Sequence, residues 1–254
     1  MIRFKTLFFK ETRRFLRVPG QTLAQPVVTT ALYFLVFGYA LGGRVREDAS
    51  LGGVPYVRFI VPGLVMLSVI QNAFLNTASS MFIMKVQGTI VDILVAPLGA
   101  LEILGAFVLG AIVRGLMVAG IVWLVAAFFT GFQVASPVWL LAFALLVGAT
   151  FGLLGLMIAI WSDKFEQLNI IPTFVITPLT FLGGVFYSPE MLPEPWHAIT
   201  RANPILYMVE GLRYGLIGTS HSSPWLGLGV TGAIAAVAFA ITWWMLASGY
   251  KLRS

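Results

Sequence analysis

The sequence predicts an all-α polytopic membrane protein with six transmembrane helices, and three observations support this fold class. Hydrophobic residues make up 59% of the 254-residue chain and charged residues only 10%, whereas a globular domain carries roughly 25% charged residues. Apolar stretches that reach the roughly 20 residues needed to cross a bilayer recur along the chain. Cysteine is absent and histidine occurs twice, which argues against a disulfide framework and a multi-histidine metal site.

Residues 1–21 are predicted to form an amphipathic helix that lies in the membrane interface. Between residues 2 and 18, apolar side chains recur on one helical face and basic side chains on the other (Phe4, Leu7, Phe8 and Phe15; Arg3, Lys10, Arg14 and Arg17). We expect the apolar side to face lipid and the basic side to face anionic headgroups. The alternative is a positively charged flank without fixed structure.

Six apolar stretches follow, and each is predicted to span the membrane: 22–43, 56–81, 103–129, 137–161, 169–187 and 224–249. The fifth is short and is interrupted by Pro172, Pro178 and Gly183-Gly184. The segment 188–223 between the last two spans is rich in prolines, and helical spacing predicts a short helix over 205–217. We expect this segment to form external re-entrant helices that enter the membrane without crossing it.

The basic residues predict the orientation of the chain. An even number of spans places both termini on one side, and that side then holds ten basic residues against five on the other. The ten are Arg3, Lys5, Lys10, Arg13, Arg14, Arg17, Lys85, Lys164, Lys251 and Arg253; the five are Arg44, Arg46, Arg58, Arg201 and Arg213. Because cytoplasmic loops are enriched in Lys and Arg, both termini are predicted to be cytoplasmic.

Common catalytic motifs are absent from the sequence. No Gly-Lys dipeptide occurs, which excludes a P-loop, and neither HExxH nor GxSxG is present. His221 and Ser222 are adjacent, but no carboxylate lies near them in sequence, and we interpret the pairing as chance. The sequence therefore predicts a chain that is not an enzyme and binds no metal or cofactor of its own.

Polar residues inside the predicted spans are candidates for a translocation path. Ser68, Asn72, Asn76 and Ser80 are spaced by four in the second span, so they lie on one helical face. Such a stripe forms either a translocation surface or interhelical hydrogen bonds. Arg114 lies near the middle of the third span, where a charge marks a functional site by default. Its alternative role is pairing with a carboxylate or with helix-terminal carbonyl groups.

Two further patterns concern contacts between segments. Within the cytoplasmic segment 82–102, a short helix is predicted after Gly88 and ends at Pro97. Its exposed apolar side needs a cover, either a partner protein or the headgroup layer. Glu210 and Arg213 are spaced to form an i,i+3 ion pair. Glycine pairs at GxxxG spacing predict close helix contacts (Gly148 with Gly152, and Gly211 with Gly215).

Five segments in the right order between the spans make the whole chain similar to a known family. They are Lys10-Glu11 with Arg13-Arg14-Phe15, YVRFIVPG from Tyr56, GTIVDILVAPL from Gly88, PLTFLGGVFY from Pro178 and NPILYMVEGLRYG from Asn203. On these residues the chain resembles the type 2 ATP-binding-cassette (ABC) exporter permeases. That family includes bacterial drug, polysaccharide and nodulation-factor exporters.

The resemblance implies a single permease domain over 1–254, located in the bacterial inner membrane, that forms a homodimer. It implies two copies of a separate ATPase subunit, which would bind ATP and Mg²⁺. It also assigns expected roles to three groups of residues. These are a connecting helix (Lys10, Glu11, Arg13, Arg14, Arg17), an ATPase-coupling segment (Lys85, Gly88, Thr89, Asp92, Pro97, Glu102) and an external gate (Phe186, Tyr187, Glu210, Arg213).

The function expected from the residues and the resemblance together is the export of a lipid-like, drug-like or glycan substrate, driven by a partner ATPase. An ion-coupled secondary transporter or channel is an alternative, although Arg114 is the one clear midplane charge and no internal repeat is evident. A non-transporting membrane scaffold is a second alternative. No nucleic-acid partner is expected, because the basic residues are placed as at a membrane surface.

Overall fold

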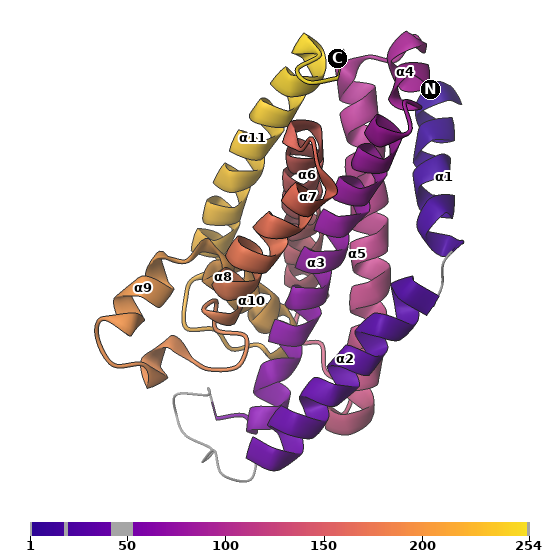
Figure 1. Cartoon of the computed structure of the whole chain (residues 1–254). Helices are drawn as coiled ribbons and strands as arrows, with labels where there is room; N and C mark the ends of the chain where they lie inside the picture. The colour runs from indigo at the N-terminus through magenta and orange to yellow at the C-terminus, as the bar shows by residue number, and fades with distance from the viewer. Residues whose placement is uncertain (1, 18–19, 42–52, 253–254) are drawn as a thin grey trace.

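The computed structural model describes residues 2–17, 20–41 and 53–252, and every regular element in these ranges is helical. Four helices are long and apolar enough to cross a membrane: α3 (Tyr56–Val86), α5 (Ala100–Thr130), α6 (Pro137–Trp161) and α11 (Pro224–Ser248). They stand side by side as a bundle (Figure 1). The second, third, fourth and sixth predicted spans are thereby confirmed as long apolar helices.

The first and fifth predicted spans are helical but irregular. The first consists of η1 (Gly20–Ala24), α2 (Gln25–Tyr33) and η2 (Phe34–Leu41). The fifth consists of α7 (Phe165–Ile171), η4 (Pro172–Ile176) and α8 (Thr177–Phe181). Pro172 and Pro178 lack the N–H that continues the α-helical pattern, and η4 is a wider π-helical turn. Arg44, Arg46 and Arg253, which entered the charge comparison, lie outside the described residues.

Helix α3 is the centre of the bundle. Its most apolar stretch is 89% buried, against 22% for α11, and it packs against α5, α6 and α10. Helices α6 and α3 lie close together. Thr77 Oγ1 of α3 donates a hydrogen bond of 2.7 Å to the Gly152 carbonyl oxygen of α6. A Cβ on Gly155 would lie 2.3 Å from the Phe74 carbonyl oxygen. Glycines on α6 therefore set the distance between the two helices.

The predicted glycine contacts on α6 and on the helix predicted over 205–217 are confirmed. A Cβ on Gly152 would lie 2.9 Å from Ala111 of α5. Helix α10 (Pro204–Ile217), which matches the helix predicted over 205–217, packs against α6. A Cβ on Gly211 would lie 2.1 Å from the Phe143 ring, and one on Gly215 would lie 2.6 Å from the Leu140 backbone nitrogen.

Helix α1 (Ile2–Leu16) packs against α5 and runs beside it (Figure 1). Leu7 and Phe15 are buried, so the prediction that its apolar side faces lipid is wrong for these residues. Glycines on α5 explain the packing, since Gly105 leaves room for the Phe4 ring and Gly110 for Glu11. Small residues on one helix let a neighbouring helix approach closely.

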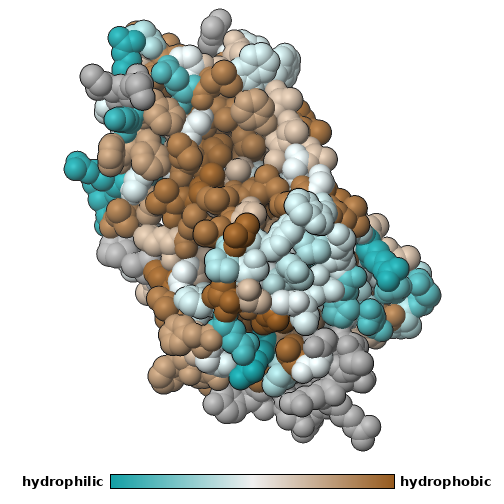
Figure 2. Space-filling view, turned by 180° about the vertical axis from the view of Figure 1, so that it is seen from behind, coloured by the Kyte–Doolittle hydropathy of each residue, from teal (hydrophilic) through white to brown (hydrophobic). Residues whose placement is uncertain are grey.

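The two ends of the bundle differ. The N-terminal end of α1, the C-terminal end of α11 and the short helix α4 (Ile90–Val95) lie together at one end (Figure 1). Toward the other end, α9 (Trp196–Ala202) projects from the side of the bundle (Figure 1), and η5 (Pro189–Met191) precedes it in the chain. A broad apolar surface covers the middle of the face in Figure 2, and hydrophilic residues gather toward its ends. An apolar band between polar ends is what a bilayer requires of a protein surface.

Candidate transport pocket, coupling end and gate

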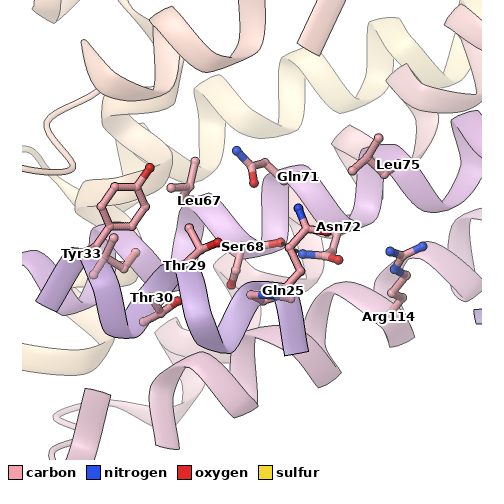
Figure 3. Close-up of a pocket in the computed structure, with 12 residues that line it drawn as sticks. Gln25, Thr29, Thr30, Tyr33, Leu67, Ser68, Gln71, Asn72, Leu75 and Arg114 are labelled. Carbon is pink, nitrogen blue, oxygen red and sulfur yellow. Dashed lines mark hydrogen bonds between the residues drawn. The ribbon is translucent and has the colours of Figure 1, made fainter. Parts of the chain in front are cut away.

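A cavity of about 80 Å³ lies between α2, α3 and α5 and joins three of the predicted path residues. Ser68 and Asn72 reach it from α3, and Arg114 reaches it from α5 (Figure 3). Helix α2 closes the other side with a largely polar face. The remaining lining residues are Gln25, Pro26, Thr29, Thr30, Tyr33, Leu64, Leu67, Gln71 and Leu75.

Arg114 has no direct partner in this pocket. Its Nε is buried, and no hydrogen bond or ion pair joins its guanidinium to any residue that the structure describes. The pocket lining contains no carboxylate. The expected alternative, in which Arg114 pairs with a carboxylate or with helix-terminal carbonyl groups, is therefore not found among the described residues.

Asn76, the third predicted residue of the polar stripe, belongs to a different site. Arg14 of α1 donates from Nη2 to the Asn76 backbone oxygen at 2.7 Å and to its Oδ1 at 3.0 Å. Glu11 is fully buried, and its Oε2 lies 3.4 Å from Arg14 Nε. Glu11, Arg14 and Asn76 thus form a polar joint between α1 and α3. Lys10 contributes a contact of 3.5 Å to Met84 Sδ, whereas Arg13 and Arg17 are exposed.

The segment 82–102 contains the short helix α4, which is exposed on one side and packs on the bundle with the other. Gly88 has φ of +72°, a left-handed conformation that favours glycine, and it turns the chain from α3 into α4. The predicted short helix between Gly88 and Pro97 is thereby confirmed as α4. Its residues Ile90 and Ile93 are buried, while Val91 and Val95 are exposed. Thr89, Asp92 and Pro97 are exposed as well.

Three polar side chains make hydrogen bonds on either side of α4. Lys85 Nζ donates to the carbonyl oxygens of Ile160 (3.0 Å) and Ser162 (2.8 Å), which lie at the end of α6. Arg3 Nη1 donates to the Pro97 carbonyl oxygen at 2.9 Å. Glu102 Oε2 accepts from the Gly99 N–H at 3.0 Å and caps α5. Lys85 and Glu102 therefore stabilise the surroundings of α4, and the exposed residues form its surface.

Asp163 joins the ends of three long helices at the same place. Its carboxylate accepts from Lys251 Nζ at 2.6 Å, beyond α11, and lies 3.4 Å from Lys85 Nζ of α3. The hydrogen bond from Lys251 lowers the pKa of Asp163, and the positive charge of Lys85 acts in the same direction. Sequence reasoning missed this junction because Asp163 lies more than seventy positions from either lysine.

At the opposite end, Glu210 and Arg213 of α10 form the predicted i,i+3 ion pair, and both side chains are 1% exposed. Arg213 also donates from Nη2 to the Gly184 carbonyl oxygen at 2.7 Å. Its guanidinium lies 3.9 Å from the centre of the Phe59 ring on α3. One arginine thus connects α10 to the turn after α8 and to the central helix.

His221 completes this charge cluster, a role that sequence reasoning missed because Glu210 lies eleven positions away. Its backbone N–H donates to Glu210 Oε2 at 2.5 Å, and its ring Nδ1 lies 3.5 Å from the same oxygen. Glu190 Oε2 lies 3.9 Å from the ring Nε2. The hydrogen bond with Glu210 raises the pKa of His221. That His221 and Ser222 do not form a catalytic dyad stays a prediction.

Phe186 and Tyr187 lie in the turn between α8 and η5. The Phe186 ring stacks on Phe37 at 4.4 Å between centroids, and Tyr33 lies 5.5 Å away. Tyr56 donates from its hydroxyl to the Phe186 carbonyl oxygen at 2.9 Å. Tyr187 donates to the Leu182 carbonyl oxygen at 2.9 Å, which closes its own turn. These contacts join the first and fifth predicted spans.

Comparison with known proteins identifies the family to which this architecture belongs. The family model described as ABC-2 type transporter matches residues 2–217. The chain belongs to the ABC-2 type transporter family. It is accordingly the membrane permease subunit of a transporter and not an enzyme.

Named relatives lie within the same family. The chain is 40% identical to the inner membrane transport permease YadH of Escherichia coli (strain K12), over all of this chain and 98% of that protein. It is 27% identical to nodulation protein J of Rhizobium meliloti (strain 1021), over 85% of this chain and 80% of that one. The resemblance proposed from the sequence is thereby confirmed.

Proposed function

We propose that this ABC-2 permease forms the membrane half of an ATP-driven exporter in the bacterial inner membrane. Two copies would pair as a homodimer and engage two copies of a separate ATPase that binds ATP and Mg²⁺. The observation that carries the proposal is the exposed tip of α4, where Val91 and Val95 are exposed although Ile90 and Ile93 are buried. An apolar surface beyond the ends of the long helices favours a protein partner.

The surroundings of α4 suit the transmission of force. Lys85 connects the end of α3 to the end of α6, and Arg3 connects α1 to the loop after α4. A displacement of α4 would therefore reach α1, α3 and α6 together, as near-rigid bodies. Lys10, Glu11, Arg13, Arg14 and Arg17 would act as the connecting helix in the same movement.

The proposed topology has six spans with both termini cytoplasmic. The irregular segments 20–41 and 165–181 would complete the spans that α3, α5, α6 and α11 begin. Residues 188–223 would then be external and re-entrant, with Phe186, Tyr187, Glu210 and Arg213 at the gate. The N-terminal end of α1 and the C-terminal end of α11 lie at the end that bears α4, which supports this arrangement (Figure 1).

The pocket between α2, α3 and α5 is the proposed substrate path, through Ser68, Asn72 and Arg114. Asn76 would act instead on the joint between α1 and α3. The cargo would be a lipid-like, drug-like or glycan molecule that leaves the cytoplasm.

Purification of the chain from bacterial membranes with its bound ATPase tests the proposal. The double variant Val91→Glu/Val95→Glu is expected to lose the ATPase, because two charges replace the exposed apolar surface of α4. Val138→Glu is the matched control, since Val138 is also exposed but lies at the opposite end of the bundle. Transport by the chain in liposomes without any ATPase would contradict the proposal.

A further inference from the structure

We propose that the pocket between α2, α3 and α5 binds the anionic head of a lipid-like molecule through the Arg114 guanidinium. The inference rests on the proposed export function in naming a class of cargo, an amphiphile with a phosphate or carboxylate head. The binding site itself is independent of transport and is testable on the chain alone.

Among the residues that the structure describes, the charge balance around the pocket leaves the Arg114 charge without a counterion. Arg114 lies one helical turn after Gly110 on α5, and the Glu11 side chain of α1 packs against Gly110. Glu11 is the carboxylate at this place, and it is paired with Arg14 at 3.4 Å. Because a charge near the middle of a membrane is costly without a partner, the site favours an anion.

The two arginines are not equivalent. Arg14 uses its Nη atoms in hydrogen bonds to the Asn76 oxygens and to Ser79 Oγ (3.2 Å). The guanidinium of Arg114 makes no such bond with the residues that the structure describes, and its side chain lines the cavity (Figure 3). A free guanidinium offers a planar pair of donors that matches phosphate or carboxylate oxygens.

The other polar groups of the α3 wall have little donor capacity left. Ser68 Oγ donates to the Val65 carbonyl oxygen at 2.7 Å, and Asn72 Nδ2 donates to the Ser68 carbonyl oxygen at 3.1 Å. The exposed amides of Gln25 and Gln71 remain at the mouth of the pocket. On the α3 and α5 sides the donors offered to a ligand are thus chiefly Arg114 and Gln71, and α2 adds the Gln25 amide and the hydroxyls of Thr29, Thr30 and Tyr33.

The shape and the apolar lining select an amphiphile over a free anion. Leu64, Leu67 and Leu75 line the same cavity, and Leu75 is 41% exposed at its edge. The cavity of about 80 Å³ admits a phosphate or carboxylate group, and an acyl chain would extend past Leu75 at its edge. A neutral hydrophobic compound would leave Arg114 unpaired, so this pocket disfavours that class of cargo.

Photolabelling tests the site. The purified chain is placed in phosphatidylcholine nanodiscs that contain, at equal mole fraction, a diazirine analogue of either phosphatidic acid or phosphatidylcholine. Labelled peptides are mapped by mass spectrometry. We expect the anionic probe to label residues 25–33 and 64–75 about tenfold more than the zwitterionic probe, since hydrogen bonds between charged groups have this order of strength.

Variants test whether Arg114 causes the preference for the anionic probe. Arg114→Gln should abolish the preference for the anionic probe, and Arg114→Lys should retain part of it. Gln71→Glu, at the exposed mouth, should weaken anionic labelling without any change at Arg114, which keeps the test valid if Arg114→Gln fails to fold. Arg13→Gln removes an exposed positive charge outside the pocket and should leave the preference intact. Equal labelling by both probes, or an unchanged preference in Arg114→Gln, would overturn the proposal.

A second experiment distinguishes a transported cargo from a resident membrane lipid as the source of the anionic headgroup. With the partner ATPase and ATP present, a cargo should leave the pocket and reach the opposite leaflet, so that labelling falls. A resident membrane lipid should stay, and labelling should be unchanged, which supports the anion site but overturns its extension to the cargo. Failure to find an ATPase would contradict the proposed function and leave the labelling result intact.

Discussion

Replacement of Gly155 by alanine tests whether α3 and α6 pack as closely as the structure shows. The added Cβ would lie 2.3 Å from the Phe74 carbonyl oxygen and 2.5 Å from Thr77 Oγ1. Over-packing of this kind costs about 1–3 kcal/mol. Separation of the helices would also lengthen the hydrogen bond from Thr77 to Gly152, worth roughly 0.6 kcal/mol in a membrane protein.

The gain in helix propensity from glycine to alanine is about 1 kcal/mol and opposes these costs. A net loss of about 1.5 kcal/mol in the free energy of unfolding is therefore expected for Gly155→Ala, combining the over-packing, hydrogen-bond and propensity terms. Gly232→Ala in α11 is the matched control, because nothing lies within 4 Å of its added Cβ. The control should be slightly more stable than the parent chain.

Unfolding by sodium dodecyl sulfate in detergent micelles, followed by circular dichroism, measures both variants. Truncation of Thr77 to alanine should not rescue Gly155→Ala, because the nearest atom belongs to the backbone of Phe74. Equal stability of Gly155→Ala and Gly232→Ala would refute the packing of α6 against α3.

Two further predictions concern the charge cluster around Glu210. Glu210→Gln should destabilise the chain by about 3–5 kcal/mol, because it leaves the buried Arg213 charge without its partner; a loss of less than 1 kcal/mol in the same assay would contradict this pairing. The raised pKa of His221 predicts that its contribution to stability is fully present below its ordinary value of 6.5 and is lost as the pH rises through the raised value. The difference in unfolding midpoint between the parent chain and His221→Ala should shrink with rising pH, and a difference that grows would exclude an ion pair with Glu210.

Most of the fold is predictable from the sequence because lipid imposes a simple pattern. Four apolar runs correspond to the helices α3, α5, α6 and α11, and local glycine spacing correctly placed the contacts at Gly152 and Gly211. The ion pair between Glu210 and Arg213 was predictable for the same reason, since its partners lie one helical turn apart.

Features that depend on distant segments were not predictable. The packing of α1 against α5 depends on Gly105 and Gly110, whose five-residue spacing defines no single face of the helix. The separation of Asn76 from Asn72 depends on Arg14, which turns from the basic side of α1 toward α3. Helical periodicity identifies a face but not the neighbour that covers it.

The absence of cysteine from the sequence allows a direct test of the central claim, the docking of α4 on an ATPase. Val95→Cys introduces a single thiol at a side chain that is 78% exposed in the parent chain. A heterobifunctional crosslinker with one maleimide arm should join it to an ATPase subunit in native membranes, and ATP should change the yield. Val138→Cys, in the first turn of α6 and so at the opposite end of the bundle, should give no such product. An ATPase crosslinked at Val138→Cys and not at Val95→Cys would contradict the account.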